Sequence, residues 1–552
     1  MMRRLVAALA ALGAAACTTI PAPRTAQPVE VQILAFNDFH GNLEPPPPVD
    51  VIEADGSKRT IISGGAAHLA AALSQLRAGH PDTVTVSAGD TIGASPLISA
   101  NYLDEPTIDA MNLLGLEFNS VGNHEFDKGV AELKRMQAGG CAKYTRRTPC
   151  GLEPFAGAHF RYLAANVVQA DGTTVFPATG IKDFGSIKIG FIGMTLKGTK
   201  QLVTPSGVQG VTFADEAETA NALVPKLKAE GADTIVLLIH QGGKLPQFTT
   251  GNGCEGLYGD ILPILPKLDP AIATVISGHS HWAYVCRGTQ QVAGRLLTSA
   301  GKYGYFVTDL RLRFDPSTHR LIGQDATNVV VGNGERGDDP AVKALVGRYE
   351  TAIAPVANQV IGRLTATAKK SEDESEGPAA DLVADSMLGA TNGAAQIALV
   401  NATGIRVDLP GGDVRYKDAF TMMPFGNNLV VMSLTGAQLK AVLEQQYGVP
   451  PRPKKELPAA LAPSAGFTYA VDVNRPAGGR VSDMRLNGKP IDPAIRYRVV
   501  VNNYMASGGD GLTGFTAGTD VTDTGIIDLD ALVAWIAKGQ TPPTPNRIRF
   551  TP

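Results

Sequence analysis

Several features that would simplify interpretation are missing from this chain of 552 residues. Its five cysteines form no Cys-x-x-Cys pair, which argues against a zinc site built from thiolates. Lysine and arginine are dispersed and the net charge is only -3, so the basic surface that a nucleic-acid polymer requires is not indicated. Beyond the N-terminal segment, no run reaches the about 18 apolar residues that mark a membrane-spanning helix. The hydrophobic content of 44% is nevertheless ample for large globular cores.

The N-terminal segment has the pattern of a secretion signal. Two arginines precede the apolar run Leu5–Ala16, whose 12 residues are too few to cross a bilayer. The small residues before Cys17 resemble the cleavage site of a bacterial lipoprotein, although Ala14 stands where leucine is usual. We therefore expect a signal peptide at 1–17, a lipid on Cys17, a linker at 18–28 and a place in the bacterial cell envelope, periplasmic or lipid-anchored. Plain cleavage without a lipid and a buried N-terminal helix are the alternatives.

The remaining cysteines predict two disulfides. If Cys17 carries the lipid, four cysteines are left in an oxidising compartment, where thiols pair. Their order along the chain suggests the bonds Cys141–Cys150 and Cys254–Cys286.

The length predicts two to four domains, and the pattern of apolar runs divides the chain. From residue 29 onwards, strand-like segments such as VEVQILAF (29–36) alternate with helix-like ones such as GGAAHLAAALSQLRAG (64–79), which indicates α/β architecture. A turn-rich segment and one helix, which we expect to be exposed, interrupt this pattern. We predict a first domain at 29–334, a linker helix at 335–358 and a second α/β or α+β domain at 359–552.

Candidate metal ligands follow strand-like runs at five places. These are FNDFHG with Asp38 and His40, SAGD with Asp90, SVGNHEFD with Asn123, His124 and Asp127, LLIHQGG with His240, and ISGHSHW with His279 and His281. In open α/β sheets, ligands bind beyond the carboxyl ends of the strands. A single Asp-x-His triplet would indicate little, but five such segments favour a metal site over polar loops with satisfied histidines.

At these segments the chain resembles the dinuclear metallophosphoesterases and, more closely, the secreted bacterial 5′-nucleotidase family. The motifs NDFHG, GD, GNHEFD and GHSH occur in that family's order, and the resemblance covers nearly all of residues 30–545. It implies an α/β fold with a metallophosphoesterase-type β-sandwich flanked by helices. A separate α/β (α+β) nucleotide-recognition domain is expected to follow.

The resemblance also implies two divalent metal ions. Two such ions about 3.5–4 Å apart can bracket a displacement at phosphorus, and they need a bridging anion because they repel one another. Mixed nitrogen and oxygen ligands favour Zn, Mn, Fe or Co. The implied ligands are Asp38, His40 and His281 for one ion, Asn123, His240 and His279 for the other, and Asp90 as the bridge.

The implied reaction is attack on phosphorus by a metal-bound hydroxide, because a bound water has its pKa lowered to about 7. His124 matches the family's catalytic histidine, and we expect it to stabilise charge on the transferring phosphoryl group or on the leaving oxygen. Asp127, about one helical turn further on, is expected to orient the imidazole. Asp127 could also simply cap a helix, and the two roles are compatible.

In the second half, the resemblance indicates residues that contact a nucleotide. Two aromatic rings are expected to sandwich the base, and tyrosine in place of the family's usual phenylalanine at 504 still presents a π face. The family often has an arginine before the first helix of this domain, and none occurs at 371–385. Both aromatic residues could instead be core residues. The implied contacts are Asn401 and Arg406 in NATGIR, Phe425 in MPFGN, and Tyr504 and Asp510 in NNYMASGGDG.

The leading hypothesis is a secreted two-metal phosphohydrolase that releases phosphate from nucleoside 5′-monophosphates. Hydrolysis of 2′,3′-cyclic nucleotides or nucleotide sugars at the same site is the first alternative. A sulfur-oxidation hydrolase of the same architecture and a non-catalytic nucleotide-binding protein of the envelope are the others. The expected partner is a nucleotide, with no nucleic-acid polymer and no membrane contact except through the lipid.

Overall fold

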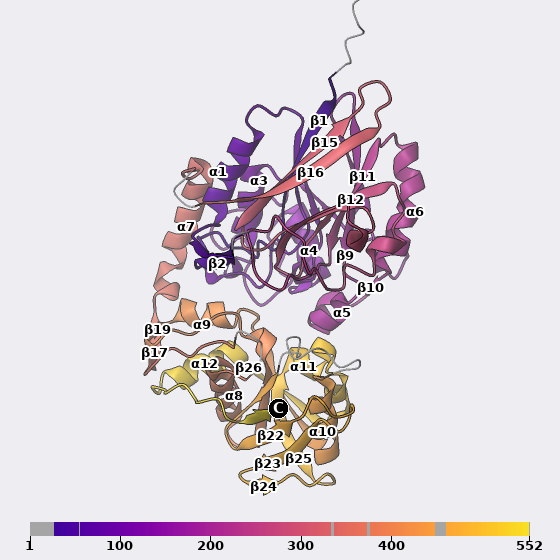
Figure 1. Cartoon of the computed structure of the whole chain (residues 1–552). Helices are drawn as coiled ribbons and strands as arrows, with labels where there is room; N and C mark the ends of the chain where they lie inside the picture. The colour runs from indigo at the N-terminus through magenta and orange to yellow at the C-terminus, as the bar shows by residue number, and fades with distance from the viewer. Residues whose placement is uncertain (1–26, 54–55, 333–335, 372–375, 448–459, 551–552) are drawn as a thin grey trace, which may run out of the picture.

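The computed structural model describes residues 27–53, 56–332, 336–371, 376–447 and 460–550. The expected signal peptide, Cys17 and most of the expected linker lie outside these residues. The chain forms two lobes, the first built from strands β1 to β16 and the second from β17 to β27 (Figure 1). Among the helices of the described residues, none has both the length and the apolar character needed to cross a bilayer.

Two six-stranded sheets form the first lobe, with the strand orders β16-β15-β1-β4-β5-β6 and β13-β14-β12-β11-β9-β8. The central strands of each sheet run parallel, so their carboxyl ends meet at one edge. The bounds are β1 Val29–Phe36, β4 Thr83–Ser87, β5 Phe118–Ser120, β6 Arg161–Leu163, β8 Thr179–Asp183, β9 Lys188–Thr195, β11 Thr234–His240, β12 Ile272–Ser277, β13 Ala283–Arg287, β14 Leu296–Ala300, β15 Phe306–Phe314 and β16 Leu321–Val330. Two small two-stranded antiparallel sheets are added, one by β2 Val49–Ile52 with β3 Lys58–Ile61 and one by β7 Val167–Gln169 with β10 Val211–Phe213.

The two sheets pack face to face because successive side chains of a strand point to opposite faces. On β1, Val31 and Ile33 share one buried core with Phe191 and Val236 of the other sheet. Leu34 points the other way, into a core formed with helices. The predicted β-sandwich flanked by helices is thus confirmed. The flanking helices are α1 Ala66–Arg77 and α3 Glu105–Leu114 on the first sheet, and α6 Glu216–Ala229 on the second.

Helix α7, Pro340–Ala357, connects the lobes and runs along one side of the molecule (Figure 1). Asp339 caps it by accepting hydrogen bonds from two backbone N–H groups of the first turn. The expectation of an exposed helix was wrong for one of its faces. Leu345, Tyr349 and Ile353 are buried at helical spacing against α1 and α3. The helix is therefore packed onto the first lobe rather than free in solvent.

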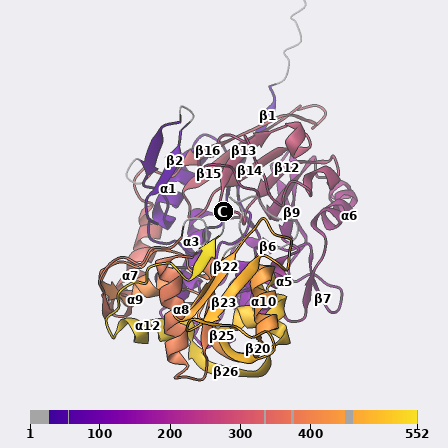
Figure 2. The ribbon, with the colours of Figure 1, turned by 60° about the horizontal axis from the view of Figure 1, so that its bottom comes forward.

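The second lobe has a five-stranded sheet in the order β21-β18-β25-β20-β26, and a four-stranded sheet, β24-β23-β22-β27. Helices α8 and α10 lie on opposite faces of the larger sheet, since Val400 and Val431 pack with α8 while Leu399 and Met432 pack with α10 (Figure 2). The expected second α/β (α+β) domain is thus confirmed. The strands are β17 Val360–Leu364, β18 Ile397–Asn401, β19 Gly412–Arg415, β20 Asn428–Thr435, β21 Leu461–Pro463, β22 Phe467–Val471, β23 Val481–Leu486, β24 Lys489–Pro490, β25 Arg496–Asn502, β26 Thr519–Ile527 and β27 Ile548–Phe550. The helices are α8 Pro378–Ala390, α9 Tyr416–Met422, α10 Gly436–Gln445, α11 Asn503–Ala506 and α12 Asp528–Ile536.

Both predicted disulfides are present. Cys141 and Cys150 are joined with their Cα atoms 5.5 Å apart, and Cys254 and Cys286 with theirs 5.0 Å apart. The second bond links the loop after β11 to strand β13, on either side of the two histidines that follow β12.

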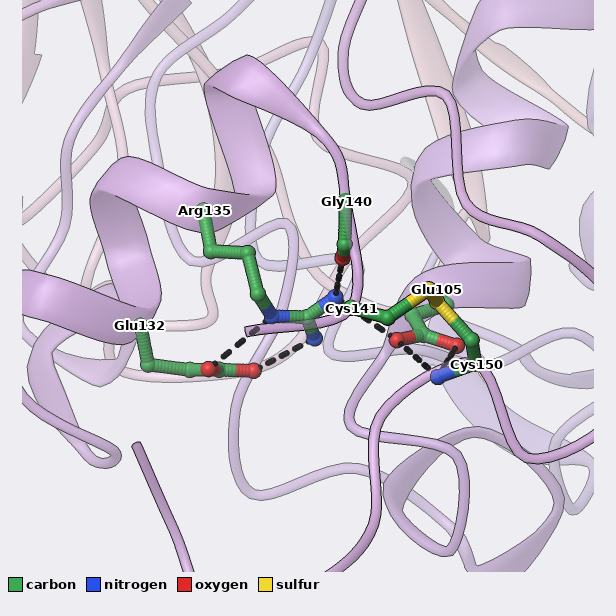
Figure 3. The surroundings of a disulfide bond; sticks show 6 residues. All are labelled: Glu105, Glu132, Arg135, Gly140, Cys141 and Cys150. Atoms are coloured by element: carbon green, nitrogen blue, oxygen red, sulfur yellow. Dashed lines mark hydrogen bonds and ion pairs between the residues drawn. A yellow bond between two sulfur atoms is a disulfide. The ribbon is translucent and has the colours of Figure 1, made fainter. Parts of the chain in front are cut away.

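A buried ion cluster supports the first disulfide and the helix α4, Val130–Ala138 (Figure 3). The guanidinium of Arg135 donates to Glu132 at 2.6 and 3.0 Å, to Glu105 at 2.7 Å and to the carbonyl oxygen of Gly140 at 2.8 Å. Glu105 also accepts from the backbone N–H of Cys150. The cluster therefore ties α3, α4 and the disulfide loop into one unit, directly after the segment that carries His124 and Asp127.

We expect Arg135→Ala to lower the free energy of unfolding by about 3–5 kcal/mol, because two buried carboxylates would lose their partner. Chemical denaturation followed by fluorescence measures it. Arg348→Ala is the matched control, since its pair with Glu153 is exposed and should contribute about 0–1 kcal/mol. Equal small losses for both variants would contradict a stabilising role for the buried cluster.

Candidate metal centre

All the predicted ligands lie at one edge of the sandwich, where β1, β4, β5, β11 and β12 end. Five of them have a positive φ: Asp38 (51°), His40 (48°), Asp90 (51°), His279 (70°) and His281 (64°). L-residues rarely adopt this conformation, and each instance costs of order 1–3 kcal/mol unless the surroundings enforce it. Such strain concentrated on candidate ligands is typical of a preorganised functional site.

The first ligand group consists of Asp38, His40 and His281. His40 Nε2 lies 3.0 Å from His281 Nε2, and Asp38 Oδ1 lies 3.9 and 3.6 Å from these two atoms. The Nδ1 atom of His40 faces the carbonyl oxygen of Gly93 at 2.9 Å, so Nε2 is the atom turned towards the group.

The second ligand group consists of Asp90, His240 and His279, with Asn123 beside it. His240 Nε2 lies 3.0 Å from Asp90 Oδ2, and His279 Nδ1 lies 3.0 Å from Asn123 Oδ1. Asp90 Oδ2 is also 3.7 Å from His40 Nε2 in the first group. Asp90 therefore lies between the two groups, where a bridging carboxylate is required.

The chemistry of these donors fits two divalent cations. The Nδ1 atom of His240 is 2.8 Å from the carbonyl oxygen of Ala88, so its Nε2 is the atom turned towards Asp90 and the ligand group. Burial lowers the pKa of His40 and of His279 to about 3, which keeps both imidazoles in the neutral form that binds metals. Burial also raises the pKa of Asp38 to about 7, so this carboxylate lacks a sufficient cationic partner within the protein.

His124 and Asp127 form the predicted pair. His124 begins a short 3₁₀ helix, His124–Phe126, and its Nδ1 lies 2.9 Å from Asp127 Oδ2. Its backbone N–H donates to Asp90 Oδ1 at 2.9 Å, and its ring centroid is 5.2 Å from that of His40. Burial opposes the charged imidazolium, but the carboxylates of Asp127 and Asp90 outweigh it and raise the pKa of His124. A protonated imidazole beside the metal ligands can donate a proton or stabilise negative charge.

Two positioning residues were missed in the sequence. The carboxylate of Glu125 accepts from the backbone N–H groups of Asp90 at 2.9 Å, Thr91 at 2.8 Å and Gly122 at 2.6 Å, which joins two ligand-bearing turns. Asn37 donates to Asp38 Oδ2 at 2.6 Å. Their only sequence signal was adjacency to ligands, within NDFH and GNHE.

Two of the predicted nucleotide contacts reach the metal centre from the second lobe. The ring of Phe425 stacks on that of His124, with centroids 5.9 Å apart and planes inclined by 17°. The guanidinium of Arg406 lies 5.8 Å from the Phe425 centroid. Phe425 is half-buried and does not belong to a hydrophobic core cluster of the described residues, so its core interpretation is not favoured.

The other three predicted contacts form a connected set. Asp510 accepts from the Tyr504 hydroxyl at 2.7 Å and from the Asn401 amide at 2.9 Å. The same hydroxyl is 3.0 Å from the carbonyl oxygen of Gln201, in helix α5 (Thr199–Leu202) of the first lobe. Burial and Asp510, and more weakly Asp127 of the first lobe, raise the pKa of Tyr504. Tyr504 therefore lies at the contact between the lobes, although part of its ring also packs on the core of the second lobe.

Comparison with known proteins agrees with this arrangement. Residues 31–283 match the calcineurin-like phosphoesterase family, and residues 356–517 match the 5′-nucleotidase C-terminal domain. The chain thus combines a calcineurin-like phosphoesterase region with a 5′-nucleotidase C-terminal domain. Together with the two ligand groups, these matches support a metal-dependent phosphoester hydrolase.

Several known proteins are similar to this chain. The chain is 29% identical to endonuclease YhcR of Bacillus subtilis over 87% of its own length, but spans only 37% of that protein. It is 28% identical to cell wall protein Lmo0130 of Listeria monocytogenes over 94% of its length and spans 68% of that relative. The crystal structure of a 5′-nucleotidase precursor from Thermus thermophilus superposes with a TM-score of 0.76 and 26% identity, covering 95% of this chain and 99% of the other.

Proposed function

We propose that the protein releases phosphate from nucleoside 5′-monophosphates, with the phosphate at the metal centre and the base held by residues of the second lobe. The observation that carries the proposal is the stacking of Phe425 on His124, which joins a base-sized aromatic surface to the hydrolytic centre. Two ions would be held by Asp38, His40 and His281 and by Asn123, His240 and His279, with Asp90 as the bridge. We take Zn, Mn, Fe and Co as the candidate ions, since the donors are mixed nitrogen and oxygen.

When bound, such ions activate a water nucleophile and neutralise phosphoryl charge. Residues of the chain orient the metal ligands and the catalytic imidazole. Glu125 and Asn37 fix the ligand carboxylates, Asp127 holds His124, and the imidazolium of His124 can give its proton to the departing oxygen of the nucleoside. Direct attack by water requires inversion at phosphorus, whereas a covalent phosphoenzyme would give retention.

A substrate panel tests the proposed function. Metal-stripped protein should regain phosphate release when Zn, Mn, Fe or Co is added. The value of kcat/KM should be higher for nucleoside 5′-monophosphates than for 2′,3′-cyclic nucleotides or nucleotide sugars. The opposite order would overturn the proposal in favour of a diester or pyrophosphate substrate.

The aromatic residues of the second lobe provide a sharper prediction. We expect Phe425→Ala and Tyr504→Ala each to lower kcat/KM for a nucleoside monophosphate by about 5–150-fold, because one stacked base contributes about 1–3 kcal/mol. Hydrolysis of p-nitrophenyl phosphate, whose leaving group is small, should be nearly unchanged. Tyr504→Phe is the matched control, since it keeps the ring and removes only the hydroxyl that contacts Asp510 and Gln201.

The small ester also separates two roles of Phe425. If Phe425→Ala lowers the rates on both substrates equally, Phe425 supports His124 and does not bind the base. If Tyr504→Ala does the same, Tyr504 is a core residue of the second lobe.

A location in the cell envelope is part of the proposal. The two disulfides support an oxidising compartment, and one relative is a cell wall protein. Mass spectrometry of the N-terminus of the protein purified from its own cells tests secretion and the lipid at Cys17. An unprocessed start would overturn both.

A further inference from the structure

A turn beside the first ligand group carries polar side chains that the proposed reaction does not yet use. Lys302 and Tyr303 follow strand β14, and the backbone N–H of Tyr303 donates to the carbonyl oxygen of Asp38 at 2.8 Å. Tyr303 has a φ of 55°, so this turn is strained in the same way as the ligand turns. Its ring centroid lies 6.0 Å from those of both His40 and His281. The turn therefore forms one wall of the metal centre.

This wall carries positive charge without a matching acid. The ammonium of Lys302 lies 4.7 Å from the Tyr303 centroid, and the guanidinium of Arg406 lies 5.8 Å from the Phe425 centroid. In the described part of the chain, no carboxylate lies within ion-pair distance of Lys302 or Arg406. Lys128, near His124, is also half-buried, but it pairs with the buried carboxylate of Asp104.

The two cations lie beside the metal centre. The ring of Tyr303, over which the ammonium of Lys302 lies, has its centroid 6.0 Å from that of His281. Arg406 lies 5.8 Å from the ring centroid of Phe425, which stacks on His124. A cation within reach of a ligand of the first group is also within reach of an anion held at that group. Two half-buried cations without carboxylate partners in the described residues thus lie next to rings that contact the ligand histidines and His124.

We propose that Lys302, together with the Tyr303 hydroxyl and Arg406, holds non-bridging oxygens of the phosphoryl group and selects phosphate monoesters over diesters. A monoester carries close to two negative charges at neutral pH, whereas a diester carries one. The attraction of a fixed ammonium scales with the charge of its partner. The inference rests on the proposed phosphohydrolase activity and assigns part of its substrate selectivity to one lysine.

The test compares a monoester with a diester that has the same leaving group. We expect Lys302→Met to lower kcat/KM for p-nitrophenyl phosphate by about 10–100-fold, the effect of losing a hydrogen bond to a charged group. The loss for bis(p-nitrophenyl) phosphate should stay below about 3-fold, and Lys302→Arg should restore most of the monoester rate. Lys538→Met is the matched control, because Lys538 lies 5.3 Å from the ring centroid of Trp535 in the second lobe.

A second measurement does not depend on turnover. Calorimetric titration with inorganic phosphate should show about 10-fold or weaker binding for Lys302→Met, and a smaller loss for Tyr303→Phe, while metal content stays at the wild-type level. Equal losses on both esters, unchanged phosphate affinity or loss of metal would each overturn the proposed subsite. A wild-type preference for diesters would instead overturn the proposed function, and the ratio of the two rates in Lys302→Met would still test the subsite.

Discussion

Asp90→Asn should lower phosphate release by more than about 10³-fold and remove at least one metal ion from the purified protein. The reason is the position of its carboxylate, 3.0 Å from His240 Nε2 and 3.7 Å from His40 Nε2, between the two ligand groups. Although burial opposes ionisation, His240 and the other nearby histidines hold the pKa of Asp90 below its usual value, so the group is anionic. Without that charge, two dications at bridging distance would repel each other, and several kcal/mol of transition-state stabilisation would be lost.

Metal analysis by mass spectrometry and rates measured on the same samples check this prediction. Asp413→Asn is a control for the loss of one carboxylate, because its pair with Arg363 is exposed in the second lobe. Full retention of both metals and of activity in Asp90→Asn would contradict the bridging role.

His124→Ala should behave differently, keeping both metals and losing about 10²–10⁴ in kcat, because its imidazole acts on charge that develops in the transition state. The ring is held by Asp127 at 2.9 Å and does not belong to either ligand group. If its task is to protonate the leaving oxygen, the loss should be smaller for p-nitrophenyl phosphate, whose leaving group needs less help than a nucleoside.

His68→Ala is the matched control, since His68 forms a similar pair with Asp338, 3.0 Å apart, in the first lobe. Loss of metal from His124→Ala, as from Asp90→Asn, would show that the division between ligand and catalytic histidine is wrong. Equal losses on the nucleotide and on the small ester would place the charge that His124 stabilises on the transferring phosphoryl group.

The metal centre could be predicted residue by residue because its ligands follow strands directly. Asp38, Asp90 and His240 each lie at the end of an apolar strand or just after it. Parallel strands bring such ends together at one edge of the sheet. The two disulfides could also be predicted from the sequence, because pairing four cysteines in their order along the chain gives Cys141–Cys150 and Cys254–Cys286. The strand ends and the order of the cysteines can be read within short segments. The only further rule needed is that parallel strands end at the same edge of a sheet.

Other features depended on contacts between distant segments. The sequence predicted an exposed connecting helix at 335–358. Whether the apolar stripe of such a helix is buried depends on which segments lie beside it. In the structure α1 and α3 lie beside α7 and cover this stripe. The role of Glu125 follows from three backbone N–H groups on two separate turns. No pattern within a single segment encodes such a convergence.

By itself, the sequence indicated the candidate metal ligands and determined that two α/β lobes are present, because strand ends, glycine turns and hydrophobic periodicity are local features. Only the tertiary structure decided that Phe425 of the second lobe stacks on His124 and that Lys302 lies over the ring of Tyr303 without a carboxylate partner in the described residues. Phe425 and His124 are separated by about 300 positions in the sequence. The sequence around Lys302 does not indicate which side chains surround it. Their chemistry depends on packing between lobes and on the nearby charge, which periodicity and spacing do not contain.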